Sequence, residues 1–287
     1  MGWSLKRSGQ KNWKDNDMER EKRLLRRTSA ASLFCWVFLA AAGIGYGQDA
    51  STDLAKKAQN PVSDLISVPF QNNFNFGVGP EDKTQYILNI QPVLPQRISD
   101  QWNWVHRAII PLIDQPAPVD KFGLGDIQYQ GFLSPAKPGS LTWGVGPVLQ
   151  VPSATDDLLG TEKWSAGVGA VFLRMDGPWV YGALVNNIWS FAGNDDRADV
   201  NQMLIQPFLN YNLGRGLAIG SVPIITANWE AQSGQKWTVP LGAQVSQIIP
   251  IGKVPVNFLL GAYYNVEKPD NGPDWNLRFQ IALLFPK

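Results

Sequence analysis

The sequence predicts an all-β protein: an antiparallel transmembrane β-barrel of about 12 strands, preceded by an N-terminal signal peptide. Three observations predict this class, namely a basic leader with an apolar run, long segments of alternating polarity, and tryptophans at the segment ends. The last segment, from Trp275 to Phe285, is the clearest, because every second residue is large and apolar. Its length, at a tilt of about 40°, covers roughly the 25 Å apolar band of an outer-membrane barrel.

Residues 1–47 are predicted to be the signal peptide. Lys and Arg are concentrated in the first 30 residues, and an apolar run follows from about Ala31 to Ile44. The run is short for a bilayer span, so cleavage is expected just before Gln48 or after Ala50, with an uncleaved anchor as the alternative. The protein is therefore expected to be exported, with its signal peptide cleaved, to the outer membrane of a Gram-negative bacterium.

The leader leaves two further points open. Met18 is a second candidate for the first residue, because a start there gives a more ordinary basic region. Cys35 lies inside the apolar run after Phe34, whereas a lipidation site needs a small residue before the cysteine. No other cysteine follows, which excludes disulfides and thiolate chemistry in the exported chain.

Residues 48–66 are predicted to be a periplasmic linker or short helix, with a helical turn near 53–58 that Pro61 ends. Residues 67–287 are predicted to form the barrel. Its strands, placed by alternation and turn signals, are 67–78, 84–94, 101–111, 124–133, 141–151, 164–174, 178–189, 201–211, 217–228, 236–247, 254–265 and 275–285. An even number is expected when both ends of a bacterial barrel lie in the periplasm.

Tryptophan supports a lipid-embedded wall. All the tryptophans beyond the leader lie at or near a predicted strand end: Trp102, Trp104, Trp143 and Trp179 at the inner ends, and Trp164, Trp189, Trp229, Trp237 and Trp275 at the outer ends. Two aromatic girdles are typical of membrane barrels. The alternative, a soluble periplasmic β fold, would more often bury tryptophan in mid-strand.

The face opposite the apolar one is rich in amides and poor in charge. The candidate lumen-lining residues are Arg107, Asp126, Gln128, Gln150, Gln206, Gln244, Arg278 and Gln280. A barrel of this size lies between those filled by side chains and open porins, so the lumen is either a narrow passage or is plugged by amides that bond across it. Arg107, Asp126 and Arg278 form either a constriction that selects ligands or an internal set of salt bridges.

Acidic residues predominate in the longer connections. The candidate residues of the loop mouth are Asp156, Asp157, Asp195, Asp196 and Asp199. They enrich cations, bind divalent ions that bridge to lipopolysaccharide, or are solvated charges without a specific task. The expected partners are the lipid bilayer and lipopolysaccharide, the outer-membrane assembly machinery and a small-molecule permeant, and nothing suggests nucleic acid.

The sequence predicts that the chain is not an enzyme and has no cofactor. Outer-membrane phospholipases need a His with a Ser two residues later, whereas the single histidine, His106, is followed at that position by Ala108. No catalytic, cofactor-binding or metal site is predicted, because no cluster of His, Cys and carboxylates has ligand spacing. A Ser, Asp or Glu close to His106 in the fold would revive the hydrolase class.

Several local motifs resemble one outer-membrane family, labelled putative MetA-pathway of phenol degradation, whose members are often described only as transporters and sometimes carry the misleading name neuromedin U. The resemblance covers roughly Pro61 to Lys287, and its motifs are FGLGD at 122–126, WGVGP at 143–147, PSATDDLLG at 152–160, WSFAGNDDRADVN at 189–201 and LRFQIALLFPK at 277–287. It implies a β-barrel associated with uptake of aromatic or other hydrophobic compounds, and it brings no set of functional residues. Fatty-acid and toluene channels are more distant and plug the lumen with an N-terminal hatch, for which residues 48–66 are too few.

The sequence thus predicts an outer-membrane channel or transporter for passive uptake of small molecules, hydrophobic or aromatic ones among them. The acidic loops would form the entrance, and the wall of amides and apolar side chains would provide weak contacts. The alternative is a non-conducting barrel with a structural or surface-binding role. The two differ in whether the lumen is open.

Overall fold

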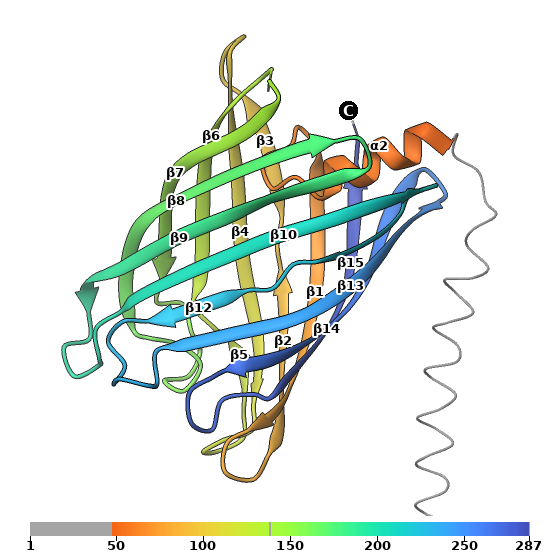
Figure 1. Cartoon of the computed structure of the whole chain (residues 1–287). Coiled ribbons are helices and arrows are strands. Elements are labelled where there is room, and N and C mark those ends of the chain that lie inside the picture. The colour runs from red at the N-terminus through yellow and green to blue at the C-terminus, as the bar shows by residue number, and fades with distance from the viewer. Residues whose placement is uncertain (1–47, 138, 287) are drawn as a thin grey trace, which may run out of the picture. The chain divides into compact units, whose positions relative to one another are not determined.

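The computed structural model describes residues 48–137 and 139–286, so the predicted signal peptide lies outside the described residues. The described part contains one helix and fifteen strands (Figure 1). They are α2 (Gln48–Ala58), β1 (Ile66–Val78), β2 (Lys83–Ile90), β3 (Val93–Arg97), β4 (Trp102–Gln115), β5 (Lys121–Leu124), β6 (Ile127–Pro135), β7 (Leu141–Val151), β8 (Lys163–Asp176), β9 (Trp179–Gly193), β10 (Asn201–Gly214), β11 (Leu217–Ser221), β12 (Ile225–Asn228), β13 (Trp237–Ile251), β14 (Val254–Glu267) and β15 (Trp275–Phe285). No helix of this part is long and apolar enough to cross a membrane.

The strands form one closed antiparallel barrel. β1 pairs with β15 from Ile66↔Phe285 to Phe76↔Trp275, and β9 pairs with β10 from Trp179↔Tyr211 to Trp189↔Asn201. Three wall strands are interrupted, so that β2 and β3, β5 and β6, and β11 and β12 each form one wall strand. The wall therefore has twelve strands, which confirms the predicted fold class.

The observed strands follow the predicted segments closely. The largest differences are at β4, β9 and β13, each of which extends about four residues beyond its predicted end. The β4 extension follows Pro111, and the β13 extension contains Pro250. Proline has no N–H for the ladder and is therefore treated as a strand boundary in sequence. In the barrel the ladder continues, with Pro111 opposite Asn89.

Each interruption of a wall strand contains a proline or a glycine: Pro92, Gly125 or Pro223. At the third, the backbone groups of Val222 are satisfied by side chains from other wall strands. Val222 N donates to Tyr263 Oη at 3.2 Å, and Arg278 Nη1 donates to Val222 O at 3.0 Å. A gap in the ladder thus leaves neither group of Val222 unpaired within the wall.

Side chains alternate between the outer and inner faces of the wall. In β15 the exposed residues include Trp275, Leu277 and Phe285, whereas the buried ones are Arg278, Ala282 and Leu284. The exposed large apolar side chains of the other strands have the same outward direction. An apolar exterior of this extent is suited to lipid, since a soluble surface rarely has so large an apolar patch.

Aromatic pairs occupy both rims of the barrel. We call the rim where β1 begins and β15 ends the terminal end, and the opposite rim the loop end. At the terminal end the rings of Trp102 and Trp143 lie 5.8 Å apart, and at the loop end those of Trp229 and Trp237 lie 5.4 Å apart. Tyr264 and Trp275 form a further pair at the loop end. These positions are those of the two girdles that the sequence predicts.

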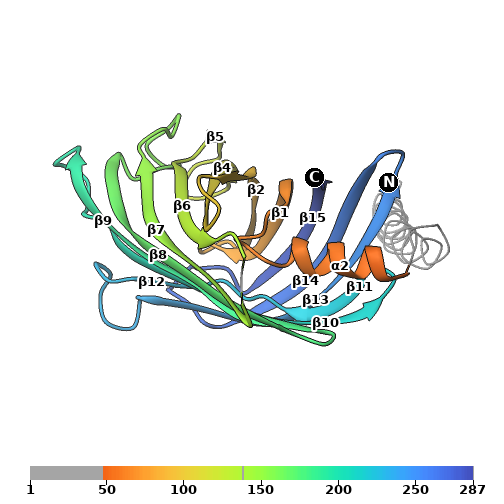
Figure 2. The ribbon, with the colours of Figure 1, turned by 90° about the horizontal axis from the view of Figure 1, so that it is seen from above.

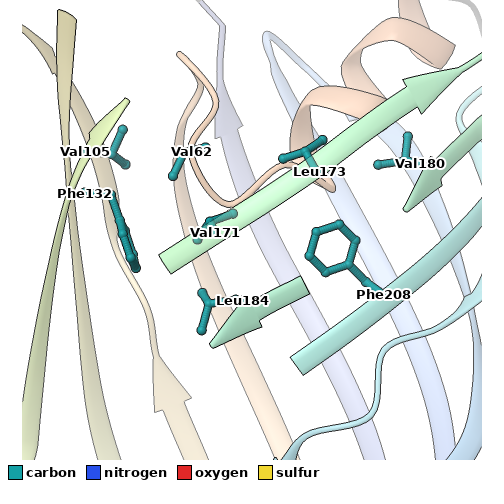
Figure 3. Close-up of a cluster of buried hydrophobic side chains, with 8 residues drawn as sticks. All are labelled: Val62, Val105, Phe132, Val171, Leu173, Val180, Leu184 and Phe208. Atoms are coloured by element: carbon teal, nitrogen blue, oxygen red, sulfur yellow. The ribbon is translucent and has the colours of Figure 1, made fainter. Parts of the chain in front are cut away.

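The largest buried apolar cluster lies inside the barrel towards the terminal end (Figure 3). One member, Val62, comes from the loop after α2, and the others come from strands: Val105, Phe132, Val171, Leu173, Val180, Leu184 and Phe208. A second cluster joins Ala55 and Leu65 to inward residues of β13 and β15. The segment that precedes β1 therefore packs against the inner wall, with α2 at the terminal end (Figures 1 and 2).

The lipid-facing assignment of β15 can be tested by adding one charge to each face. Ile281→Lys is expected to prevent assembly, because a lysine on the lipid face near the midplane costs about 2–4 kcal/mol. The matched control is Gln280→Lys, whose side chain enters the cavity inside the barrel. The measurement is the amount of heat-modifiable barrel in the outer-membrane fraction, and equal amounts for both variants would contradict the assignment.

Candidate functional site

A cavity of about 160 Å³ lies inside the barrel, between the N-terminal segment and the inner wall. One side is formed by residues 57–65, and the other sides by inward residues of β1, β3, β4, β10, β13, β14 and β15. Five of the candidate lumen-lining residues contribute to it: Arg107, Gln206, Gln244, Arg278 and Gln280. The remaining three, Asp126, Gln128 and Gln150, lie elsewhere on the inner wall.

The N-terminal segment is held in the lumen by apolar and polar contacts. Val62 is 4% exposed within its cluster of strand residues. Gln59 Nε2 donates to Asn212 Oδ1 at 3.0 Å. Although residues 48–66 were expected to be too few for a hatch, part of this segment packs inside the lumen, which the sequence did not predict. The apolar residues Val62 and Leu65, close to Pro61 in an otherwise polar stretch, are the signal in the sequence that this expectation overlooked.

Arg278, which is buried, and Arg107, which is half-buried, have no acidic partner among the described residues. Arg278 is 5% exposed, and its Cζ lies 4.9 Å from the centre of the Tyr263 ring. Arg107 Nη2 donates to Gln91 Oε1 at 2.7 Å. Among the described residues no ion pair includes Arg107, Asp126 or Arg278. The interpretation of these three residues as an internal set of salt bridges is therefore wrong.

Asp126 instead anchors a loop. Its carboxylate accepts hydrogen bonds from Thr161 N and Thr161 Oγ1, both at 2.7 Å, and from Ala154 N at 3.3 Å. Gln150 Nε2 lies 3.5 Å from the same carboxylate. Asp126 thus ties both ends of the connection 152–162 between β7 and β8 to the start of β6. The sequence places Asp126 on the inner face but gives no sign of this partner loop.

Amides of the inner wall bond to neighbours along the wall. Gln130 Nε2 donates to Gln128 Oε1 at 2.7 Å. A longer row crosses four neighbouring strands, in which Asn276 donates to Asn75, Asn75 to Gln85, and Gln85 to Gln115. These partners lie on adjacent strands, so this row does not plug the lumen by bonding across it. The lumen is narrowed by the N-terminal segment instead.

The candidate residues of the loop mouth lie in two connections. Asp156 and Asp157 are in 152–162, and Asp195, Asp196 and Asp199 are in 194–200. Asp156 Oδ2 lies 2.6 Å from Lys121 Nζ, and Asp199 Oδ1 lies 3.4 Å from Lys163 Nζ. Part of the acidic charge is therefore paired within the loops.

The hydrogen bond from Lys121 lowers the pKa of the Asp156 carboxyl, and one from Leu158 N lowers it further. Because this pKa is lower in the folded protein, the pair stabilises the loop above the ordinary Asp pKa of about 3.9. The stabilisation is lost as the pH falls through the lower folded value.

Arg197 joins the two loops, which the sequence analysis missed. Its Nη2 donates to Asp157 O at 2.8 Å and to Gly160 O at 2.7 Å, and its Nη1 lies 3.6 Å from Glu162 Oε1. A lone arginine in an acidic loop resembles a solvated charge in sequence. Only the fold brings the carbonyls of the other loop to it.

His106 has aromatic and amide neighbours. Its Nδ1 lies 2.9 Å from Tyr129 Oη, its Nε2 lies 3.1 Å from Gln96 Oε1, and its ring is 6.4 Å from that of Trp104. Within residues 48–137 and 139–286, no group of three or more His, Cys, Asp and Glu side chains is arranged to hold a metal ion.

No family model matches the sequence, and a search of the curated proteins finds no match. Among solved structures, the chain is similar to the COG4313 outer membrane channel from Pseudomonas putida F1, with a TM-score of 0.58 and 16% identity over 77% of this chain and 94% of that one. Outer membrane phospholipase A from Escherichia coli matches with a TM-score of 0.41 and 12% identity over 84% of this chain and 99% of that one. The Salmonella typhi outer membrane phospholipase dimer with bound calcium matches with a TM-score of 0.42 and 12% identity over 77% of this chain and 90% of that one. At these identities the similarity shows the fold, that of an outer-membrane β-barrel.

These comparisons correct one conclusion of the sequence analysis, that the chain is not an enzyme. The solved structures with a similar barrel include outer membrane phospholipase A, which is an enzyme. A fold does not by itself decide function, so this barrel gives no ground for excluding catalysis.

The role of Asp126 as a loop anchor can be tested by removing its carboxylate. Asp126→Ala is expected to raise amide hydrogen exchange in 152–162 by about ten-fold or more, because hydrogen bonds to a charged group contribute about 1.5–3 kcal/mol each. Asp157→Ala, which removes an exposed carboxylate from the same loop, is the control. Equal exchange in the two variants would contradict the anchor.

Proposed function

We propose that this barrel is a passive channel for small organic molecules, hydrophobic and aromatic ones in particular, across the outer membrane of a Gram-negative bacterium. Export with a cleaved signal peptide is part of the proposal, as are the periplasmic position of the terminal end and the outward position of the loop end. The resemblance to the family labelled putative MetA-pathway of phenol degradation supports the class of permeant, and the fold shared with the Pseudomonas putida channel supports passage.

The observation that carries the proposal is the cavity inside the lumen. Its volume of about 160 Å³ is close to the roughly 150 Å³ cavity that holds benzene in another protein. Its lining combines amides with apolar side chains, among them Leu65, Phe208 and Leu259. A one-ring molecule with a polar substituent therefore has both apolar and hydrogen-bonding contacts there.

The N-terminal segment acts in this proposal as a gate. It contributes one side of the cavity, and within residues 57–65 only two apolar side chains are buried against the wall, Val62 and Leu65. Movement of residues 57–65 away from the wall would widen the path towards the terminal end. Segments with few buried apolar contacts open at low free-energy cost.

The gate can be tested with two variants that introduce the same residue. Val62→Asn places an amide in the apolar cluster and is expected to release the segment and raise single-channel conductance several-fold. Asp53→Asn alters an exposed side chain of α2 that does not line the cavity and is expected to leave conductance unchanged. Single-channel conductance is measured for both variants in planar bilayers. An unchanged conductance for Val62→Asn would contradict the gate.

Passage itself is tested by uptake of simple aromatic compounds into liposomes that contain the purified barrel. We expect uptake faster than in protein-free liposomes, together with partial block of ion conductance by the same compounds. The packing of the N-terminal segment in the lumen favours a second candidate, a non-conducting structural or surface-binding barrel. A folded barrel with neither uptake nor conductance, also after Val62→Asn, would favour this second function over the channel.

A further inference from the structure

We propose that the lumenal cavity binds organic carboxylates, meaning molecules with one carboxylate on a small apolar body, and that Arg278 and Arg107 bind the carboxylate. This inference rests on the proposed function, because it names the class of permeant. It follows from the charge of the cavity, the unpartnered donor of Arg278 and the apolar part of the lining.

The cavity has uncompensated positive charge. Three basic residues line it, Lys57, Arg107 and Arg278, and of the residues that the structure describes no Asp or Glu does. Lys57 has a partner, since its Nζ lies 3.2 Å from Asp64 Oδ1. The two guanidinium groups stay charged in proteins, and charges in buried positions are usually paired. An anion in the cavity would supply the missing partner.

Arg278 also has donors that the protein does not use. A guanidinium carries five N–H donors, and Nη1 donates to Val222 O. Its Nε is buried and has no hydrogen-bond partner among the described residues. A buried donor without a partner costs free energy. A carboxylate has the planar, two-oxygen geometry that binds a guanidinium through two parallel hydrogen bonds.

The remaining lining selects the body of the ligand. Leu65, Phe208, Val222 and Leu259 contribute apolar surface, and the volume is close to that of a site for one aromatic ring. A neutral aromatic molecule would fill this space but leave both arginines unpaired. An inorganic anion would pair with the arginines but leave the apolar surface in contact with water. A small aromatic or short aliphatic carboxylate pairs with the arginines and also covers the apolar surface.

The test measures equilibrium binding to the full chain, expressed in a Gram-negative host and purified from its membranes. The probes are benzoate, benzyl alcohol as a neutral molecule with the same ring, and chloride, each titrated by calorimetry. We expect benzoate to bind at least about ten-fold more tightly than either of the others, because only benzoate forms charge-assisted hydrogen bonds and fills the apolar space.

Three arginine variants assign the site. Arg278→Gln and Arg107→Gln are each expected to weaken benzoate binding by about ten- to hundred-fold and to leave benzyl alcohol binding unchanged. Arg278→Lys is expected to keep part of the affinity, since it keeps the charge but loses the two-bond geometry. Arg174→Gln, at an exposed position outside the cavity, is the control.

Several results would overturn the inference. They are equal binding of benzoate and benzyl alcohol, binding of chloride as tight as that of benzoate, or unchanged benzoate binding in both glutamine variants. Arg278 also satisfies Val222 O, so Arg278→Gln could fail to assemble. In that case the inference is tested by Arg107→Gln and by the comparison of the three probes on the unaltered protein.

Liposome uptake separates this inference from the proposed function. A barrel that binds benzoate through its arginines but transports nothing would end the channel proposal and keep the carboxylate site. A barrel that transports benzoate and benzyl alcohol at equal rates, in the unaltered protein and in Arg107→Gln alike, would end the carboxylate site and keep the channel.

Discussion

The structure depends on one constraint, that backbone N–H and C=O groups within an apolar medium need a partner inside the protein. Pairing of β9 with β10, and of β10 with β11 and β12, closes the sheet, so that none of the described strands is an edge strand. Where Pro223 interrupts a wall strand, Tyr263 and Arg278 bond to the backbone of Val222. The wall thus requires particular polar side chains on its inner face, and these side chains line the lumen.

The same constraint explains why the inner face is rich in amides. Each amide has both donors and an acceptor, so neighbouring strands can be joined in a row without net charge. The row from Asn276 through Asn75 and Gln85 to Gln115 is one example. Because these amides bond along the wall, they leave the centre of the barrel to the N-terminal segment, which packs Val62 against the far side and encloses a cavity of about 160 Å³.

Charge is distributed in two separate zones. The loop end is acidic, but Lys121, Lys163 and Arg197 pair with carboxylates of the loops and connect them. The cavity is positively charged through Arg107 and Arg278. At physiological ionic strength, charges in solvent are screened over about 8 Å. In the proposed channel the acidic rim would act on the approach of ions, and the arginines would select the ligand bound inside.

The sequence by itself determined the barrel, its twelve strands and the direction of their side chains, because alternation has a period of two and the surrounding lipid makes one face apolar. It also put Arg107, Gln206, Gln244, Arg278 and Gln280 on the inner face for the same reason. Only the tertiary structure decided which inward residues meet. Asp126 binds a loop that follows it by some thirty residues, the arginines lie beside amides and a tyrosine, and residues 57–65 enter the lumen. Such contacts depend on barrel closure and on how one short apolar segment packs, and neither leaves a periodic signal in the sequence.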